Sequence, residues 1–63
     1  MDIQVAYHGS VVIITGRSDS GREYLDERMP EDAPLWGRDG YVVEPRYAPA
    51  IIEDLLGAGM DVA

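Results

Sequence analysis

The amino-acid sequence predicts an α+β fold: a small, mainly antiparallel sheet of three or four strands with two helices on one face. Short apolar or alternating segments between turn residues predict strands at residues 2–7, 11–15 and 41–44. Apolar residues at helical spacing predict helices at residues 19–29 and 49–56. The chain has 63 residues, which is enough for one domain, residues 1–63, and its short connections allow both helices to pack on the same side of the sheet.

The first two strands are expected to form a hairpin. In the first of them Ile3, Val5 and Tyr7 alternate with smaller or polar residues. The second, residues 11–15, reads VVIIT and is entirely β-branched, which is typical of a strand that is central in its sheet or buried on both faces. Only residues 8–10 separate the two, so the strands must run antiparallel through a tight turn.

The first helix has recognisable start and stop signals. Ser18 can cap its N-terminus, and Asp19 in the first turn lies at the positive end of the helix dipole. Leu25 and Met29, four residues apart, form a narrow apolar stripe. Pro30 stops the helix because proline disfavours helical geometry in the residue before it and lacks a backbone donor.

The second half of the chain is punctuated by proline and glycine. Residues 31–40 are expected to form a loop, Pro49 suits the first turn of the second helix, and residues 60–63 could add a short edge strand. The predicted core consists of Val5, Val11, Ile13, Leu25, Val42, Ile51, Ile52, Leu55 and Leu56.

Charge is the most informative property of the composition. Twelve Asp and Glu residues against five Arg residues give a formal net charge of -7. Such a surface repels nucleic acid and membranes and attracts basic protein surfaces. The simpler interpretation is that the acidic residues keep a small domain soluble. No apolar run approaches the roughly 20 residues that cross a bilayer, and we expect a cytoplasmic protein that contacts neither membrane nor nucleic acid directly.

The sequence contains no recognisable catalytic or metal-binding pattern. It has no cysteine, and its single histidine, His8, lies in the predicted turn. Phosphate-binding glycine loops and calcium-binding loop patterns are missing as well. We therefore predict a protein that is not an enzyme, with no catalytic residues, no metal ligands and no cofactor.

Acidic residues instead gather on the first helix. Asp19, Glu23 and Glu27 recur every four residues, which stacks their carboxylates about 6 Å apart. Like charges at this spacing destabilise a helix slightly, so helix stability does not explain them. A solvated helix face is one interpretation; a row of anions that occupies a basic groove built for DNA or RNA is the other. The predicted partner-binding residues are Asp19, Glu23, Asp26, Glu27, Glu31, Asp32 and Trp36.

Trp36 has two possible roles. It is the only tryptophan and lies in the predicted loop. In so small a domain a tryptophan is expected to cover an edge of the core, and the alternative is an exposed anchor of an interface.

Several segments carry a resemblance to known proteins. The pairs Tyr24-Leu25 and Trp36-Gly37, the sequence VEPRY at residues 43–47 and the closing helix before Gly59 resemble a family of small bacterial and prophage proteins of unknown function. In size, acidity and lack of an active site the chain is also similar to phage anti-CRISPR proteins that inhibit type I CRISPR effector complexes. The first resemblance implies no activity, and neither transfers a functional residue.

The leading hypothesis is therefore an inhibitor that occupies a basic DNA-binding surface, such as that of a CRISPR effector subunit, in a bacterial host cell. The alternative is an accessory interaction domain without inhibitory role, a monomer or weak homodimer that uses the Trp36 loop and apolar helix residues.

Overall fold

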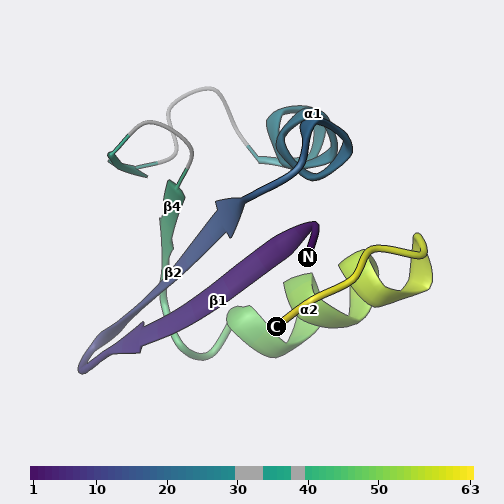
Figure 1. Cartoon of the computed structure of the whole chain (residues 1–63). Coiled ribbons are helices and arrows are strands. Elements are labelled where there is room, and N and C mark those ends of the chain that lie inside the picture. The colour runs from purple at the N-terminus through teal and green to yellow at the C-terminus, as the bar shows by residue number, and fades with distance from the viewer. Residues whose placement is uncertain (30–33, 38–39) are drawn as a thin grey trace.

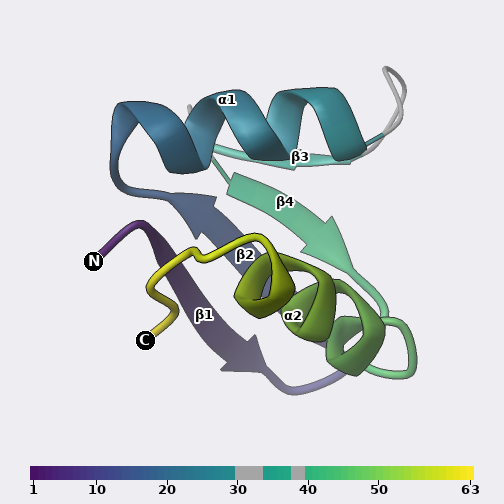
Figure 2. The same cartoon turned by 90° about the vertical axis from the view of Figure 1, so that its right-hand side faces the viewer.

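The computed structural model describes residues 1–29, 34–37 and 40–63. In chain order the elements are β1 (Ile3–His8), β2 (Val11–Gly16), α1 (Asp19–Arg28), β3 (Leu35–Trp36), β4 (Gly40–Val43) and α2 (Ala48–Gly57). The strands form one antiparallel sheet in the order β1-β2-β4-β3. Both helices lie on the same side of this sheet, as the two views show (Figures 1 and 2). The predicted α+β class is confirmed.

β2 is the central strand. It pairs with β1 through a tight turn in which Gly9 adopts a positive φ of 64°, a conformation that costs glycine little. On its other side it pairs with β4. Val12, Ile13 and Ile14 are all buried. The continuous β-branched run thus marks a central strand, as expected, and the strand extends one residue further than predicted, to Gly16.

The hydrophobic core lies between the sheet and the helices. Its buried members are Ile3, Val12, Ile14, Leu25, Val43, Ala48 and Leu55. Because the helices cover only one face, the core takes its strand residues from one of the two alternating sets. This register selects Val12 and Ile14 in β2 and Val43 in β4.

Part of the predicted core is displaced by one position. Leu25 and Leu55 are buried as expected, and Ile13 is buried on the opposite face. Val5, Ile51 and Ile52 are partly buried and pack against the core, as expected. The assignments of Val11, Val42 and Leu56 to the core are wrong: Val11 and Val42 lie on the face that neither helix covers, and Leu56 is 54% exposed. The error arises because alternation identifies two sets of strand residues but not the set that a helix will cover.

The helix boundaries agree closely with the predictions. The Ser18 hydroxyl accepts a hydrogen bond from the backbone N–H of Gly21 at 3.0 Å, which confirms the predicted cap of α1. α1 ends at Arg28, one residue earlier than predicted. α2 begins at Ala48 and places Pro49 in its first turn. Proline is tolerated there because backbone N–H groups of the first turn have no acceptor within the helix.

Asp2 connects three parts of the chain. Its carboxylate accepts hydrogen bonds from the Ser18 hydroxyl at 2.7 Å and from the Asp61 backbone N–H at 2.9 Å. The bond from the Asp61 backbone, and next that from Ser18, lower the pKa of Asp2. Beside it the expected C-terminal edge strand is reduced to a single parallel bridge between Ile3 and Val62.

β3 was not predicted and lies within the segment expected to be a loop. It contains only Leu35 and Trp36, which pair with Tyr41 and Gly40 of β4. Both β3 side chains are exposed, Trp36 by 60%, so the expectation that this tryptophan belongs to the core is wrong. Pro30, Glu31 and Asp32 lie outside the described residues, as do residues 38–39 of the predicted loop.

Candidate functional site

The predicted carboxylates of α1 form one solvent-facing surface. The side of α1 that packs on the sheet buries Gly21 and Leu25. With 3.6 residues per turn, the opposite side carries Asp19, Glu23, Asp26 and Glu27, and all four are exposed. We call these four residues the acidic face of α1. The structure thus brings together four of the seven predicted partner-binding residues; Glu31 and Asp32 lie outside the described residues, and Trp36 lies elsewhere.

The four carboxylates differ in their partners. Asp19 forms an ion pair with Arg22, one turn further along α1. The Tyr41 hydroxyl donates a hydrogen bond to Asp26 at 2.5 Å, and this bond is the main reason that the pKa of Tyr41 rises to about 12. Within the described part of the chain, Glu23 and Glu27 form no ion pair. No arginine of the described residues therefore pairs with the two carboxylates at the centre of the acidic face.

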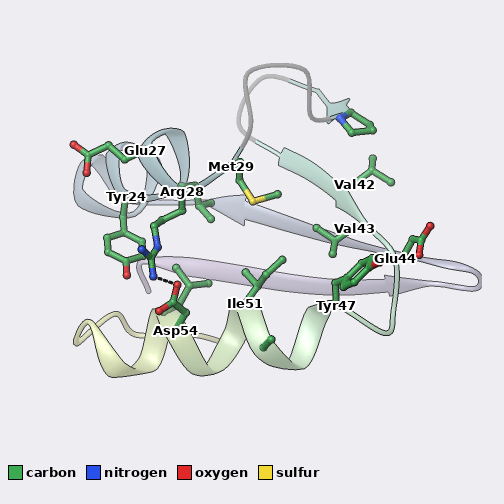
Figure 3. A pocket seen from close by; sticks show the side chains of 14 residues that line it. Tyr24, Glu27, Arg28, Met29, Val42, Val43, Glu44, Tyr47, Ile51 and Asp54 are labelled. Carbon is green, nitrogen blue, oxygen red and sulfur yellow. Dashed lines mark hydrogen bonds and ion pairs between the residues drawn. The ribbon is translucent and has the colours of Figure 1, made fainter.

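A cleft of about 870 Å³ separates α1 from α2, above the sheet (Figure 3). Its apolar lining includes Leu25 and Met29 from the α1 side, Val43 from β4, and Ile51 and Leu55 from α2. Figure 3 shows Met29, Val43 and Ile51 pointing into this space. The sheet and the two helices thus leave open a hydrophobic hollow rather than closing it with side chains.

Charged and aromatic side chains surround the cleft. At one end Arg28 forms an ion pair with Asp54, which bridges the two helices, and its guanidinium lies 5.3 Å from the centre of the Tyr24 ring (Figure 3). At the other end lie Glu44 and Tyr47.

Arg46 contacts both residues at this second end. Its guanidinium lies 5.0 Å from the centre of the Tyr47 ring, and its Nε donates to the Glu44 carboxylate at 2.8 Å. Each end of the cleft therefore carries a tyrosine ring with an arginine guanidinium over its face.

Glu27 links the cleft to the acidic face of α1, because it belongs to that face and also lines the cleft. The lining carries three carboxylates, those of Glu27, Glu44 and Asp54, against the single guanidinium of Arg28. The acidic surface and the apolar hollow are thus one continuous feature of the molecule.

Comparison with known proteins gives no match: no protein-family model, no curated protein and no solved structure matches the chain. The resemblance of the VEPRY segment to bacterial and prophage proteins therefore stays a prediction. In this structure that segment supplies Val43, Glu44 and Tyr47 to the cleft.

Sequence reasoning missed the cleft. Arg28 and Asp54, which connect the two helices across the cleft, are 26 residues apart in the chain. A local sequence pattern does not predict a contact between residues so far apart. The VEPRY segment was singled out in the sequence for its resemblance alone, although three of its residues line the cleft.

The second face of the sheet is covered by neither helix. We call it the open face; the register assigns to it Gln4, Ala6, His8, Val11, Ile13, Thr15, Trp36, Gly40 and Val42. His8 and Trp36 contact each other on this face, with ring centroids 6.1 Å apart. Trp36 therefore lies away from the acidic face with which it was grouped.

Among residues 1–29, 34–37 and 40–63, no group of three or more His, Asp or Glu side chains is arranged to hold a metal ion. No helix in the same part of the chain has the length and apolarity to cross a membrane. The predicted lack of enzymatic activity stays a prediction.

Proposed function

We propose that this protein binds and inhibits a nucleic-acid-binding protein by occupying its basic surface with the acidic face of α1 and the adjoining cleft. The observation that carries the proposal is the continuity of charge and apolar surface at Glu27, which belongs to both. Complementary charge steers association and selects the partner, while burial of apolar area supplies affinity.

The acidic face has the geometry that such an inhibitor needs. Its carboxylates repeat along a rigid helix at about 6 Å per four residues, so a partner meets a fixed row of anions. Glu23 and Glu27 form no ion pair within the described residues, which supports a role for both in accepting basic side chains of a partner. A charge pair that becomes buried at an interface can contribute about 1.5 kcal/mol or more.

The cleft gives the partner a place to anchor. A basic surface that carries one exposed apolar or aromatic side chain could insert it between Met29 and Ile51, while its arginine or lysine residues meet Glu27 and Glu44. Small numbers of buried anchors of this kind dominate most interfaces. We take the DNA-binding surface of a type I CRISPR effector complex as the first partner to test, on the basis of the general similarity to anti-CRISPR proteins.

A pair of matched charge reversals tests the acidic face. Glu23 and Glu53 are both exposed glutamates on helices, but only Glu23 belongs to the acidic face. In a mobility-shift assay of a purified type I effector on its target DNA, Glu23→Arg should abolish inhibition and Glu53→Arg should leave it intact. Equal inhibition by both variants would refute a role for the acidic face.

Salt dependence separates this function from its alternative. The exposed Leu35 and Trp36 favour an interaction domain that associates through apolar contacts and has no inhibitory role. Charge-driven binding should weaken steeply as ionic strength rises, because exposed charges are screened, whereas apolar association should change little. A salt-independent interaction would favour the alternative.

A further inference from the structure

The cleft between α1 and α2 is long enough for a short segment of helix. Along α2 its lining runs from the N-cap residue Tyr47 through Ile51 to Asp54. This stretch corresponds to about two turns, or roughly 10 Å at a rise of about 1.5 Å per residue. The volume leads to the same length, because a helix about 10 Å in diameter takes up roughly 400 Å³ per turn. The cleft has a volume of about 870 Å³, so a single inserted side chain would leave most of it unfilled.

The lining is apolar in the middle and acidic at the rim. Three apolar side chains point into the cleft: Met29, Val43 and Ile51 (Figure 3). Glu27 lies on the α1 side, where it belongs to the acidic face, and Asp54 lies on the α2 side. With Glu44 the lining has three carboxylates against the one guanidinium of Arg28, an excess of two negative charges. Such a surface is complementary to an element with an apolar centre and a positively charged rim.

The ion pairs at the rim leave room for a basic occupant. The side chains of Arg28 and Asp54 are 49% and 48% exposed, and those of Arg46 and Glu44 are 74% and 60% exposed. Ion pairs this exposed contribute little to stability, because water screens them. Each carboxylate also has two oxygens and can accept hydrogen bonds from a second guanidinium. A basic side chain can therefore share or replace either arginine at little cost.

Charge selects among the possible occupants. A second copy of the chain would bring the same net charge of -7 into an acidic cleft. Nucleic acid and anionic membrane surfaces are repelled for the same reason. A basic protein segment is the occupant that the charge of the cleft attracts.

We propose that the cleft binds a short amphipathic helix of the partner. Its apolar side chains, at helical spacing, lie on Met29 and Ile51, and its arginine or lysine residues face Glu27. The inference rests on the proposed function for the basic character of the partner. It adds which kind of element the partner inserts, about two turns of helix rather than one side chain.

A designed peptide tests the inference without an effector complex. The probe is an end-capped peptide of about twelve residues with leucine at i, i+3, i+4 and i+7 and arginine on the opposite face. The protein is labelled with ¹³C at the methyl groups of its three methionines, of which Met29 lines the cleft and Met1 does not. On titration the Met29 signal should shift and saturate, and the Met1 signal should stay in place. The peptide should gain helical circular dichroism on binding, because so short a helix is marginal when free.

Two control peptides separate the helix from its charge. A scrambled peptide of the same composition keeps the charge but has no apolar face, and a second peptide carries glutamate in place of arginine. Both should bind at least about 10-fold more weakly than the probe, because each lacks one of the two complementary features. Equal binding of the scrambled peptide would overturn the proposal. So would the lack of any Met29 shift at about 1 mM probe, where even weak binding is detected.

A matched pair of variants tests the place of binding. Ala50 and Ala58 are both exposed alanines of α2 and its C-cap, but only Ala50 lines the cleft. Ala50→Arg and Ala58→Arg change the net charge equally, and arginine is a good helix former. Ala50→Arg should weaken binding of the probe by about 30-fold or more, because the new side chain fills the cleft and repels arginine. Ala58→Arg should bind like the parent, and both variants should keep the parent's circular dichroism spectrum; equal binding by both would overturn the proposal.

The remaining outcomes separate this inference from the proposed function. A Met29 shift on concentrating the protein alone would assign the cleft to a second copy and overturn the proposal. Failure of the probe to bind, together with inhibition that depends on Glu23, would refute the helix and leave the proposed function standing. Binding of the probe in the cleft without inhibition of an effector would support the helix site and refute the inhibitory function.

Discussion

The neighbouring leucines of α2 provide a direct test of the core. Leu55 is 1% exposed and Leu56 is 54% exposed, although the two residues are identical in type and adjacent in the helix. Truncating a fully buried leucine to alanine costs about 2 to 5 kcal/mol, because apolar burial is lost and a cavity remains. A chain of this length has a total stability of roughly 3 to 9 kcal/mol. Leu55→Ala should therefore remove a large part of the stability, whereas Leu56→Ala should cost less than about 1 kcal/mol.

Urea denaturation followed by far-ultraviolet circular dichroism measures this difference. With a slope of about 1 kcal/mol per molar urea for a small domain, the two midpoints should differ by about 1 M or more. Tryptophan fluorescence is less suitable as a probe, because Trp36 is already 60% exposed in the folded protein. Equal midpoints, or a greater loss in Leu56→Ala, would show that α2 packs with a different face on the sheet.

Further tests concern two glycines and two hydrogen-bonded side chains. Gly21→Ala should destabilise the protein despite the higher helix propensity of alanine, because the new Cβ would lie 2.2 Å from the Asp2 carbonyl oxygen. Gly57 has open space around it, so Gly57→Ala should stabilise the protein by up to about 1 kcal/mol. Thermal denaturation of the two variants measures the difference. Tyr41 should ionise at a pH of about 12, and Asp26→Asn should lower that pKa toward 10 in an ultraviolet titration. Because this pKa is raised in the folded state, the stability that the Tyr41 hydrogen bond provides should be lost as the pH rises from about 10 to 12. The pKa of Asp2 is lowered in the folded state, so its contribution to the free energy of unfolding should be present above about pH 4 and lost on further acidification. In Asp2→Asn the free energy of unfolding should depend less on pH in that acidic range.

Local patterns in the sequence were enough to predict the elements of this fold. The β-branched run of β2, the Ser18 cap of α1 and Pro49 in the first turn of α2 each act within a few residues, and the structure places the corresponding elements within one residue of these signals. The carboxylates of α1 were also predictable as an exposed row, since helical periodicity alone places them opposite Leu25. Local hydrogen bonding and side-chain periodicity contain this information.

Tertiary packing decided which surfaces are buried and which side chains meet. Alternation in β4 offered Val42 and Val43 equally, and only the position of the helices on one face selected Val43 for the core. The same dependence on packing separated Leu55 from Leu56.

The cleft and the open face arise in the same way. Arg28 meets Asp54, and His8 meets Trp36, across 26 and 28 residues of chain. Such contacts depend on how strands order themselves in the sheet and where each helix crosses it. A local sequence pattern records neither, because the free energy that fixes them comes from burying apolar area between segments distant in the chain.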